Sequence, residues 1–257
     1  MDTTMLRSQH TSLEFSDDPA QQEHDVKALF SDGGAFPIKT GTEAGGPIDG
    51  ENQNKALLIE YAEQYDHVIN FAADSWIAVD KSIVVPGSLK KEDVFLASND
   101  MFREKVHGAD RIMATMSWEH TKPGLGRIHY GSVHYATKGA KPGDPNYRVS
   151  VICAEKISRW LAKNGAGSDL SFVNGDFNMP DRTLDFSLGR NFTSMADELK
   201  AWQNTGHGPI DGMCSYDRDH RVKAHKFVVL DDSEFKLYSD HFMCRGTWEI
   251  TLRKAAS

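Results

Sequence analysis

Short apolar stretches separated by turn residues make up most of this sequence, and they restrict the chain to folds rich in β-strands. Their spacing is irregular and only a few helical segments lie between them, so the sequence lacks the strict βαβ repeat of a doubly wound parallel sheet. The pattern favours an α/β sandwich, in which two sheets pack together and a few helices accompany them.

The clearest helix covers 147–161, where apolar residues recur at i, i+3 and i+4 while Lys156 and Arg159 stand outside the apolar face. Similar spacing predicts shorter helices at 23–30 and 54–65. Strands are predicted where apolar stretches are bounded by turn residues, namely at 36–39, 68–71, 75–79, 83–85, 111–118, 127–135, 170–173, 210–216, 226–230 and 247–252.

Length and charge limit the classes of protein that fit. No linker or repeat divides the 257 residues, so we predict a single domain over 1–257. A net charge of −8 provides no basic field, so any contact with DNA or RNA has to be local. The N-terminal stretch lacks the apolar core of a secretory signal, and no run reaches membrane-span length. Together with three widely spaced cysteines, Cys153, Cys214 and Cys244, this predicts a cytoplasmic protein with reduced thiols.

A hydrophobic strand at 170–173 leads into the acidic segment Gly175-Asp176-Phe177-Asn178. Asp176 and Asn178 are two residues apart, so in an extended segment both side chains point the same way. A carboxylate that activates water beside an amide that donates to an oxyanion would serve phosphoryl transfer. The same residues are also typical of a turn after a strand, so on these residues alone both interpretations stay open.

A second polar pair, Asp240 and His241, lies near the C-terminus between Ser239 and the apolar residues 242–244. Adjacent residues on a strand face opposite ways, but at a strand end they can converge on one cavity. An Asp-His dipeptide is more often part of a surface loop, yet here the pair enters an apolar strand. Carboxylates and an imidazole in such places can hold a divalent cation and ionise a water beside it.

The order of these segments along the chain, with Ile210-Asp211-Gly212 between them, resembles the endonuclease/exonuclease/phosphatase superfamily. Its members include DNase I-like and exonuclease III-like nucleases and the inositol-polyphosphate and sphingomyelin phosphodiesterases. The resemblance spans nearly the whole chain and is tight only at Asp176/Asn178 and Asp240/His241. It implies a four-layer α-β-β-α sandwich with two packed mixed β-sheets.

The resemblance also implies roles for individual residues. Glu43, which follows the strand at 36–39, would bind a divalent ion, Mg²⁺ or Mn²⁺, and Asp240 would join it or bind a second ion. The strand 128–135 looks like the family strand that ends in a phosphate-binding histidine, which is His134 here.

The remaining implied roles are catalytic. Asp176 would position or deprotonate the attacking water, and Asn178 would stabilise the transition state. His241 would act as acid/base or phosphate ligand, and Asp211 would accept its other N–H and fix its tautomer.

The sequence departs from the family pattern at two of these places. The family's first strand normally carries an Asn that helps to hold the metal and phosphate, and 6–15 contains none. Gln9, Ser12 or Glu14 are the candidates to replace it. Thr42 stands before Glu43 where Gln is usual. Such changes are compatible with slower chemistry, an altered substrate or lost activity.

Some conspicuous residues are assigned no role in the chemistry. His120 and His129 fit no zinc spacing, and His129 is predicted to face away from His134. The basic stretch 217–226 could touch a phosphate backbone but is more typical of a solvated hairpin tip.

The sequence leaves three functional hypotheses. The leading one is a Mg²⁺- or Mn²⁺-dependent phosphodiesterase that acts on nucleic acid as a nuclease. The second keeps the chemistry but takes a small phosphoester, such as a phosphoinositide or nucleotide, because the chain is acidic. The third is a catalytically silent binding protein, which the missing first-strand Asn would explain.

Overall fold

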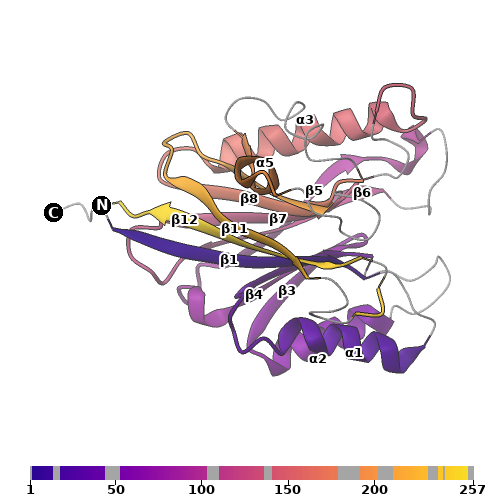
Figure 1. Cartoon of the computed structure of the whole chain (residues 1–257), viewed down its shortest axis with the longest axis horizontal. Helices are drawn as coiled ribbons and strands as arrows, with labels where there is room; N and C mark the ends of the chain where they lie inside the picture. The colour runs from indigo at the N-terminus through magenta and orange to yellow at the C-terminus, as the bar shows by residue number, and fades with distance from the viewer. Residues whose placement is uncertain are drawn as a thin grey trace.

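Strands with alternating apolar residues build two six-stranded sheets that pack face to face (Figure 1). The structure, a computed structural model, describes residues 2–13, 18–43, 53–102, 110–135, 141–178, 192–201, 211–230, 237–239 and 241–253. Helices α1 and α2 lie on the outer side of one sheet and α3 on the outer side of the other (Figure 1). The predicted α-β-β-α sandwich of two mixed sheets is therefore confirmed.

The first sheet contains the first and the last strand of the chain. Its order is β11-β12-β1-β2-β4-β3, in which β1 pairs with β2 in parallel and with β12 antiparallel. Its strands are β1 (Thr3–Ser12), β2 (Ile38–Thr42), β3 (His67–Ala72), β4 (Ser75–Asp80), β11 (Val222–Leu230) and β12 (Met243–Thr251).

The second sheet has the order β5-β6-β7-β8-β10-β9, and β7 and β8 are its parallel pair. Its strands are β5 (Lys90–Ala97), β6 (Arg111–Glu119), β7 (Arg127–His134), β8 (Leu170–Asp176), β9 (Phe192–Ser194) and β10 (Asp211–Tyr216). The helices are α1 (Pro19–Phe30), α2 (Gln53–Gln64), α3 (Tyr147–Asn164) and α5 (Met195–Leu199).

Alternation along the strands separates the space between the sheets from the helix-covered faces. On β7, Ile128 and Tyr130 belong to the core between the sheets, whereas Val133 packs beneath α3. Because successive side chains of a strand point to opposite faces, Ser132 and His134 share the inward face with Tyr130. The polar residue at the end of β7, His134, therefore lies on the face between the two sheets.

The predicted secondary structure needs three corrections. The strand expected at 83–85 is absent, because Lys81–Ile83 is a 3-10 helix that Asp80 caps by accepting the Ser82 N–H at 2.7 Å. The edge strand β5 was not predicted, since its exposed first half carries charged residues in place of apolar alternation. The basic stretch is a hairpin tip only in part, because β11 begins at Val222.

Helix α3 is confirmed, and it buries Val149, Cys153, Ile157 and Leu161 against the second sheet. Trp160 is only partly buried and packs against the margin of this core. Cys153, Cys214 and Cys244 are all buried, and none of them belongs to a disulfide. Among the helices that the structure describes, none combines the length and apolarity needed to cross a bilayer.

Candidate active site

Three predicted site residues form one row across neighbouring strands of the second sheet. The parallel pairing of β7 and β8 sets His134 opposite Asp176, and the antiparallel pairing of β8 and β10 sets Asp176 opposite Asp211. All three side chains are buried. Asn174 lies two residues before Asp176 and reaches Thr40 of the first sheet, so this face points between the sheets. Strand register thus brings together residues that are distant in the sequence.

His134 lies among three carboxylates. Its Nδ1 is 2.7 Å from Asp74 Oδ2, and its Nε2 is 3.5 Å from Asp176 Oδ2 and 4.0 Å from Glu43 Oε1. Burial alone would lower the pKa of His134, but Asp74 and then Asp176 outweigh it and raise this pKa above its usual value. Arg111 Nη1 also contacts Asp74 Oδ2, at 3.0 Å. The site therefore favours a positively charged imidazole at this point.

Asp74 was not among the predicted residues. It lies in the turn between β3 and β4, after Ala73, whose φ is +52°. Burial raises the pKa of Asp74, but His134 and Arg111 reverse this effect and hold the pKa below its usual value. Nothing in the sequence distinguishes this aspartate from an ordinary hairpin residue, because its partners come from the other sheet.

Asp211 is buried between two imidazoles. Its Oδ2 is 2.9 Å from His241 Nδ1, and its Oδ1 is 3.5 Å from His10 Nε2. Burial raises the pKa of Asp211, but His10 and His241, when their rings present an N–H to the carboxylate, outweigh burial and lower this pKa well below its usual value. Burial and the facing Asp211 carboxylate instead raise the pKa of Asp176 to about 7.

Two buried carboxylates directly opposite each other repel, so the Asp176–Asp211 pair calls for a positive charge. Asp176, Asp211 and His241 each offer a ligand atom, and these atoms lie within 4.8 Å of one another. Carboxylate oxygens and an imidazole nitrogen are donors that suit Mn²⁺ and related divalent ions, and oxygens also suit Mg²⁺. The residues present therefore fit a divalent cation.

Glu43 follows β2 and lies at the rim of the site, with 29% of its side chain exposed. Its Oε2 accepts a hydrogen bond from Ser12 Oγ at 2.7 Å, and Ser12 Oγ in turn accepts one from Thr42 Oγ1 at 2.8 Å. Glu43 itself has a φ of +58°, so its backbone turns as the strand ends. The chain thereby aims this carboxylate at His134. Asp240, the other predicted metal ligand, lies outside the described residues.

The three candidates to replace the first-strand Asn have different positions. Gln9 points to the helix side, where its Nε2 donates to the Leu29 carbonyl at 2.6 Å. Ser12 faces the site through Glu43. Glu14 lies outside the described residues. The alternation of β1 places His10 between Ser8 and Ser12 on the inward face, and His10 was not considered from the sequence.

Asn178 forms the turn that was one of the two interpretations of its segment. Its backbone N–H donates to Asp176 Oδ1 at 2.8 Å, which makes the turn, and its own φ is +48°. Its side-chain Nδ2 donates to the Tyr135 carbonyl at 3.1 Å. The turn thus fixes one oxygen of Asp176 and holds the amide beside the end of β7.

A polar network between the sheets supports the site from below. Tyr130 OH lies 2.8 Å from both Ser8 Oγ and Asn174 Oδ1. Asn174 Nδ2 donates to Thr40 Oγ1 at 3.0 Å, so strands β1, β2, β7 and β8 are joined. Buried polar groups that are fully hydrogen-bonded hold one arrangement, because any other leaves them unpaired.

A second set of contacts holds the segment before His241. Asp25 of α1 accepts the backbone N–H groups of Tyr238 and Ser239, with distances of 2.9–3.0 Å. Ser239 Oγ donates to the Ser12 carbonyl at 2.6 Å and accepts the His241 N–H at 3.2 Å. The position of His241 is therefore tied both to helix α1 and to the end of β1.

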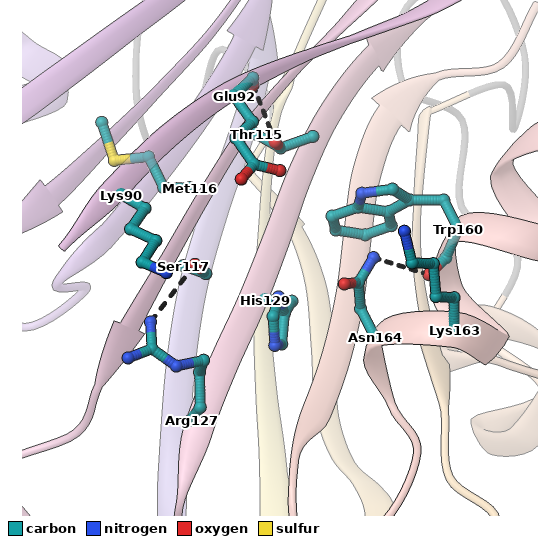
Figure 2. A pocket seen from close by; sticks show the side chains of 10 residues that line it. All are labelled: Lys90, Glu92, Thr115, Met116, Ser117, Arg127, His129, Trp160, Lys163 and Asn164. Carbon is teal, nitrogen blue, oxygen red and sulfur yellow. Dashed lines mark hydrogen bonds between the residues drawn. The ribbon is translucent and has the colours of Figure 1, made fainter. Parts of the chain in front are cut away.

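The described residues also form a pocket of about 200 Å³ between α3 and the second sheet (Figure 2). It contains Lys90, Arg127 and Lys163 but also Glu92. His129 lines it beneath α3, so the prediction that it faces away from the His134 side is confirmed (Figure 2). None of the site residues described above lines this pocket.

Comparison with solved structures shows the same fold across nearly the whole chain. An endonuclease/exonuclease/phosphatase family protein from Bacteroides thetaiotaomicron matches with a TM-score of 0.68 and 14% identity, covering 98% of this chain and 97% of its own. Zebrafish (D. rerio) TDP2 in complex with a single-strand DNA product matches with a TM-score of 0.67 and 10% identity, covering 95% and 99%.

The catalytic domain of human Nocturnin with a bound sulfate anion matches with a TM-score of 0.65 and 13% identity, covering 97% of both chains. No family model and no curated protein matches the sequence. The fold is therefore that of the endonuclease/exonuclease/phosphatase proteins.

Proposed function

We propose that the protein is a divalent-metal-dependent phosphodiesterase, and that its substrate is a nucleic acid. The observation that carries the proposal is the row His134, Asp176 and Asp211, with His241 bound to its end and Glu43 at its rim. The fold supports it, because proteins with this fold include one in complex with a DNA product and one with a bound sulfate, an anion shaped like phosphate.

His134 is the group placed to bind a phosphate oxygen. Asp74 and Asp176 favour its charged form, and an imidazolium donates to an anionic oxygen from Nε2 while Nδ1–H stays on Asp74. The guanidinium of Arg111 contacts the same Oδ2 atom of Asp74 and helps to orient this carboxylate. A charged donor fixed on two sides costs little reorganisation when a phosphate binds.

Asp176 and Asn178 are placed to handle the attacking water. Asp176 keeps one oxygen on the Asn178 N–H and turns the other towards His134 and the site. We assign it to orient and deprotonate the water, and the Asn178 amide to donate to the developing oxyanion.

His241 and Asp211 form the acid/base pair. Asp211 accepts the Nδ1–H of His241, so the proton of the neutral ring lies on Nδ1 and Nε2 is the nitrogen that exchanges a proton with substrate. Glu43, Asp176, Asp211 and Asp240 would hold the divalent cation. When bound, that ion neutralises charge on the phosphate and lowers the pKa of a coordinated water.

A small phosphoester is the second candidate substrate. The net charge of −8 favours it, because a protein with that charge does not attract a polyanion from a distance. Salt dependence separates the two substrates. Binding that neutralises many DNA phosphates releases counterions, so activity on DNA would fall steeply with salt, whereas activity on a small phosphoester would fall little.

The test is a nuclease assay on supercoiled plasmid and single-stranded DNA with Mg²⁺, Mn²⁺ or EDTA. We expect cleavage that requires metal and is lost in His241→Ala and Asp176→Asn, while His129→Ala retains it. His129 is the matched control, because it is a histidine on the same sheet that faces the other side. Cleavage in EDTA, or in His241→Ala at the wild-type rate, would remove the mechanism. No cleavage with any metal would favour a small phosphoester or a binding protein.

A further inference from the structure

His10 is a buried imidazole that the mechanism above does not use. It points inward from β1, and its side chain is 0% exposed. Its Nδ1 lies 3.0 Å from Thr40 Oγ1, and its Nε2 lies 3.5 Å from Asp211 Oδ1. His10 therefore connects the first sheet to the carboxylate row of the second.

The hydrogen bonds of Thr40 fix the tautomer of His10. The single hydroxyl hydrogen of Thr40 is donated to the Gln9 carbonyl at 3.0 Å, so Oγ1 can only accept at its other positions. Asn174 Nδ2 donates to it at 3.0 Å, and His10 Nδ1 must be the second donor. The proton of the neutral ring lies on Nδ1, and Nε2 presents a lone pair.

That lone pair faces a carboxylate. Within the described residues Nε2 makes no hydrogen bond, and the 3.5 Å to Asp211 Oδ1 is longer than an ordinary N–H···O bond, which spans about 2.7–3.2 Å. Two acceptors buried side by side repel unless a positive charge lies between them. Ligand atoms that bind one ion at about 2.0–2.2 Å are roughly 3–3.5 Å apart, which is the separation seen here.

We propose that His10 Nε2 and Asp211 Oδ1 bind the same divalent cation, and that this nitrogen ligand makes the site prefer late first-row transition ions, such as Co²⁺ and Zn²⁺, over Mg²⁺. The inference deepens the proposed metal-dependent function and rests on it for its consequence in catalysis. Asp211 then binds the ion with Oδ1 while Oδ2 holds His241, and Thr40 orients the His10 ring from its far side, as partners of metal-binding histidines do. Imidazole suits Zn²⁺ and its late first-row neighbours, whereas Mg²⁺ prefers oxygen ligands.

Two substitutions separate the two ends of the imidazole. His10→Asn keeps a donor near the Nδ1 position for Thr40 but removes the Nε2 ligand. His10→Gln places an amide oxygen near the Nε2 position, which exchanges nitrogen for oxygen. His129→Asn is the control, since it removes an imidazole that lies beneath α3, on the opposite face of the second sheet from the site.

The measurement is calorimetric titration of each metal-free protein with Mg²⁺, Mn²⁺, Co²⁺ and Zn²⁺, without substrate. We expect wild type to bind Co²⁺ and Zn²⁺ at least about tenfold more tightly than Mg²⁺. His10→Asn should weaken the binding of Co²⁺ and Zn²⁺ by about 10–100-fold and that of Mg²⁺ far less, and His10→Gln should narrow the preference for Co²⁺ and Zn²⁺ over Mg²⁺. Unchanged transition-metal affinity in His10→Asn would overturn the proposal.

A measurement on wild type covers the case in which His10 variants fail to fold. In ¹⁵N-labelled protein, Zn²⁺ should move the His10 Nε2 resonance away from that of a bare lone pair and leave Nδ1 protonated. A His10 ring protonated on both nitrogens with Zn²⁺ saturating would refute the inference. Metal binding through His10 without hydrolysis of any phosphoester would remove the proposed function and keep this site. Metal-dependent hydrolysis with unchanged metal affinity in the His10 variants would keep the proposed function and remove this site.

Discussion

Replacing Asp74 by Asn tests whether this turn residue sets the charge of His134. The two groups are 2.7 Å apart, and their side chains are only 17% and 6% exposed, so solvent screens them little. A hydrogen bond to a charged group contributes about 1.5–3 kcal/mol, and one pKa unit corresponds to about 1.4 kcal/mol. Losing this hydrogen bond in Asp74→Asn should therefore lower the pKa of His134. Arg111, which loses its own carboxylate partner, lowers it further.

The assay is an NMR titration of the His134 ring in metal-free protein, compared with Asp169→Asn as the control. Asp169 Oδ2 lies 3.4 Å from His129 Nε2, a longer and more exposed pair, so this variant should leave His134 unchanged. If His134 titrates in Asp74→Asn as it does in wild type, Asp74 does not set its charge. In that case the assignment of His134 as a charged phosphate donor fails.

The stability of the same variant should depend on pH in a defined direction. A raised histidine pKa stabilises the fold fully below the unfolded value of about 6.5, and this stabilisation is lost as pH rises through the folded pKa. The lowered pKa of Asp74 stabilises the fold above about 3.8, and this is lost as pH falls through its folded value. The deficit of Asp74→Asn in urea unfolding should therefore be largest near pH 6 and shrink towards pH 9. A deficit that grows with pH would contradict the charge assignment.

Three further substitutions test other parts of the site. Asp176→Asn should raise the melting temperature of the metal-free protein at pH 8 by several degrees, because it removes a buried carboxylate whose pKa is about 7. The same variant should lose hydrolysis. A lower melting temperature would contradict the repulsion argued between Asp176 and Asp211. Tyr130→Phe should lower the free energy of unfolding in urea by about 1–3 kcal/mol, since it removes the hydroxyl that bonds to Ser8 and Asn174. Tyr135→Phe is the control: its hydroxyl has no hydrogen-bond partner in the described residues, so the free energy of unfolding should not change. Ser12→Ala should weaken metal-dependent hydrolysis by releasing the carboxylate that Ser12 holds, and a kinetic comparison at saturating metal checks this.

The predicted site residues that lie close together in the structure are those at the ends of neighbouring strands. Asp176 ends β8 and Asp211 begins β10, and the antiparallel register pairs them. Apolar runs that stop at polar residues are visible in the sequence, and parallel or antiparallel pairing then fixes their neighbours. The roles that the resemblance implies for these residues stay predictions, which the assays above address.

Contacts between the two sheets could not be predicted from the sequence. Asp74 meets His134 only because the β3–β4 turn of one sheet lies over the end of β7 in the other. Local periodicity contains no information about how two sheets are rotated on each other, since that depends on packing of the whole inter-sheet core. The edge strand β5 was missed for a related reason, because its exposed charged residues show no apolar alternation.

His10 lay within reach of sequence reasoning, unlike Asp74. Leu6 is the apolar residue of β1 that packs between the sheets, and counting in twos from it gives Ser8, His10 and Ser12 on the same face. The same count excludes Gln9, whose amide bonds to helix α1. The three candidates for replacing the asparagine carry an amide, a hydroxyl and a carboxylate, and the imidazole of His10 was not among them. Because Nε2 of His10 lies beside Asp211, the change at this strand alters the type of ligand atom, and metal preference is the property in which that difference should be measured.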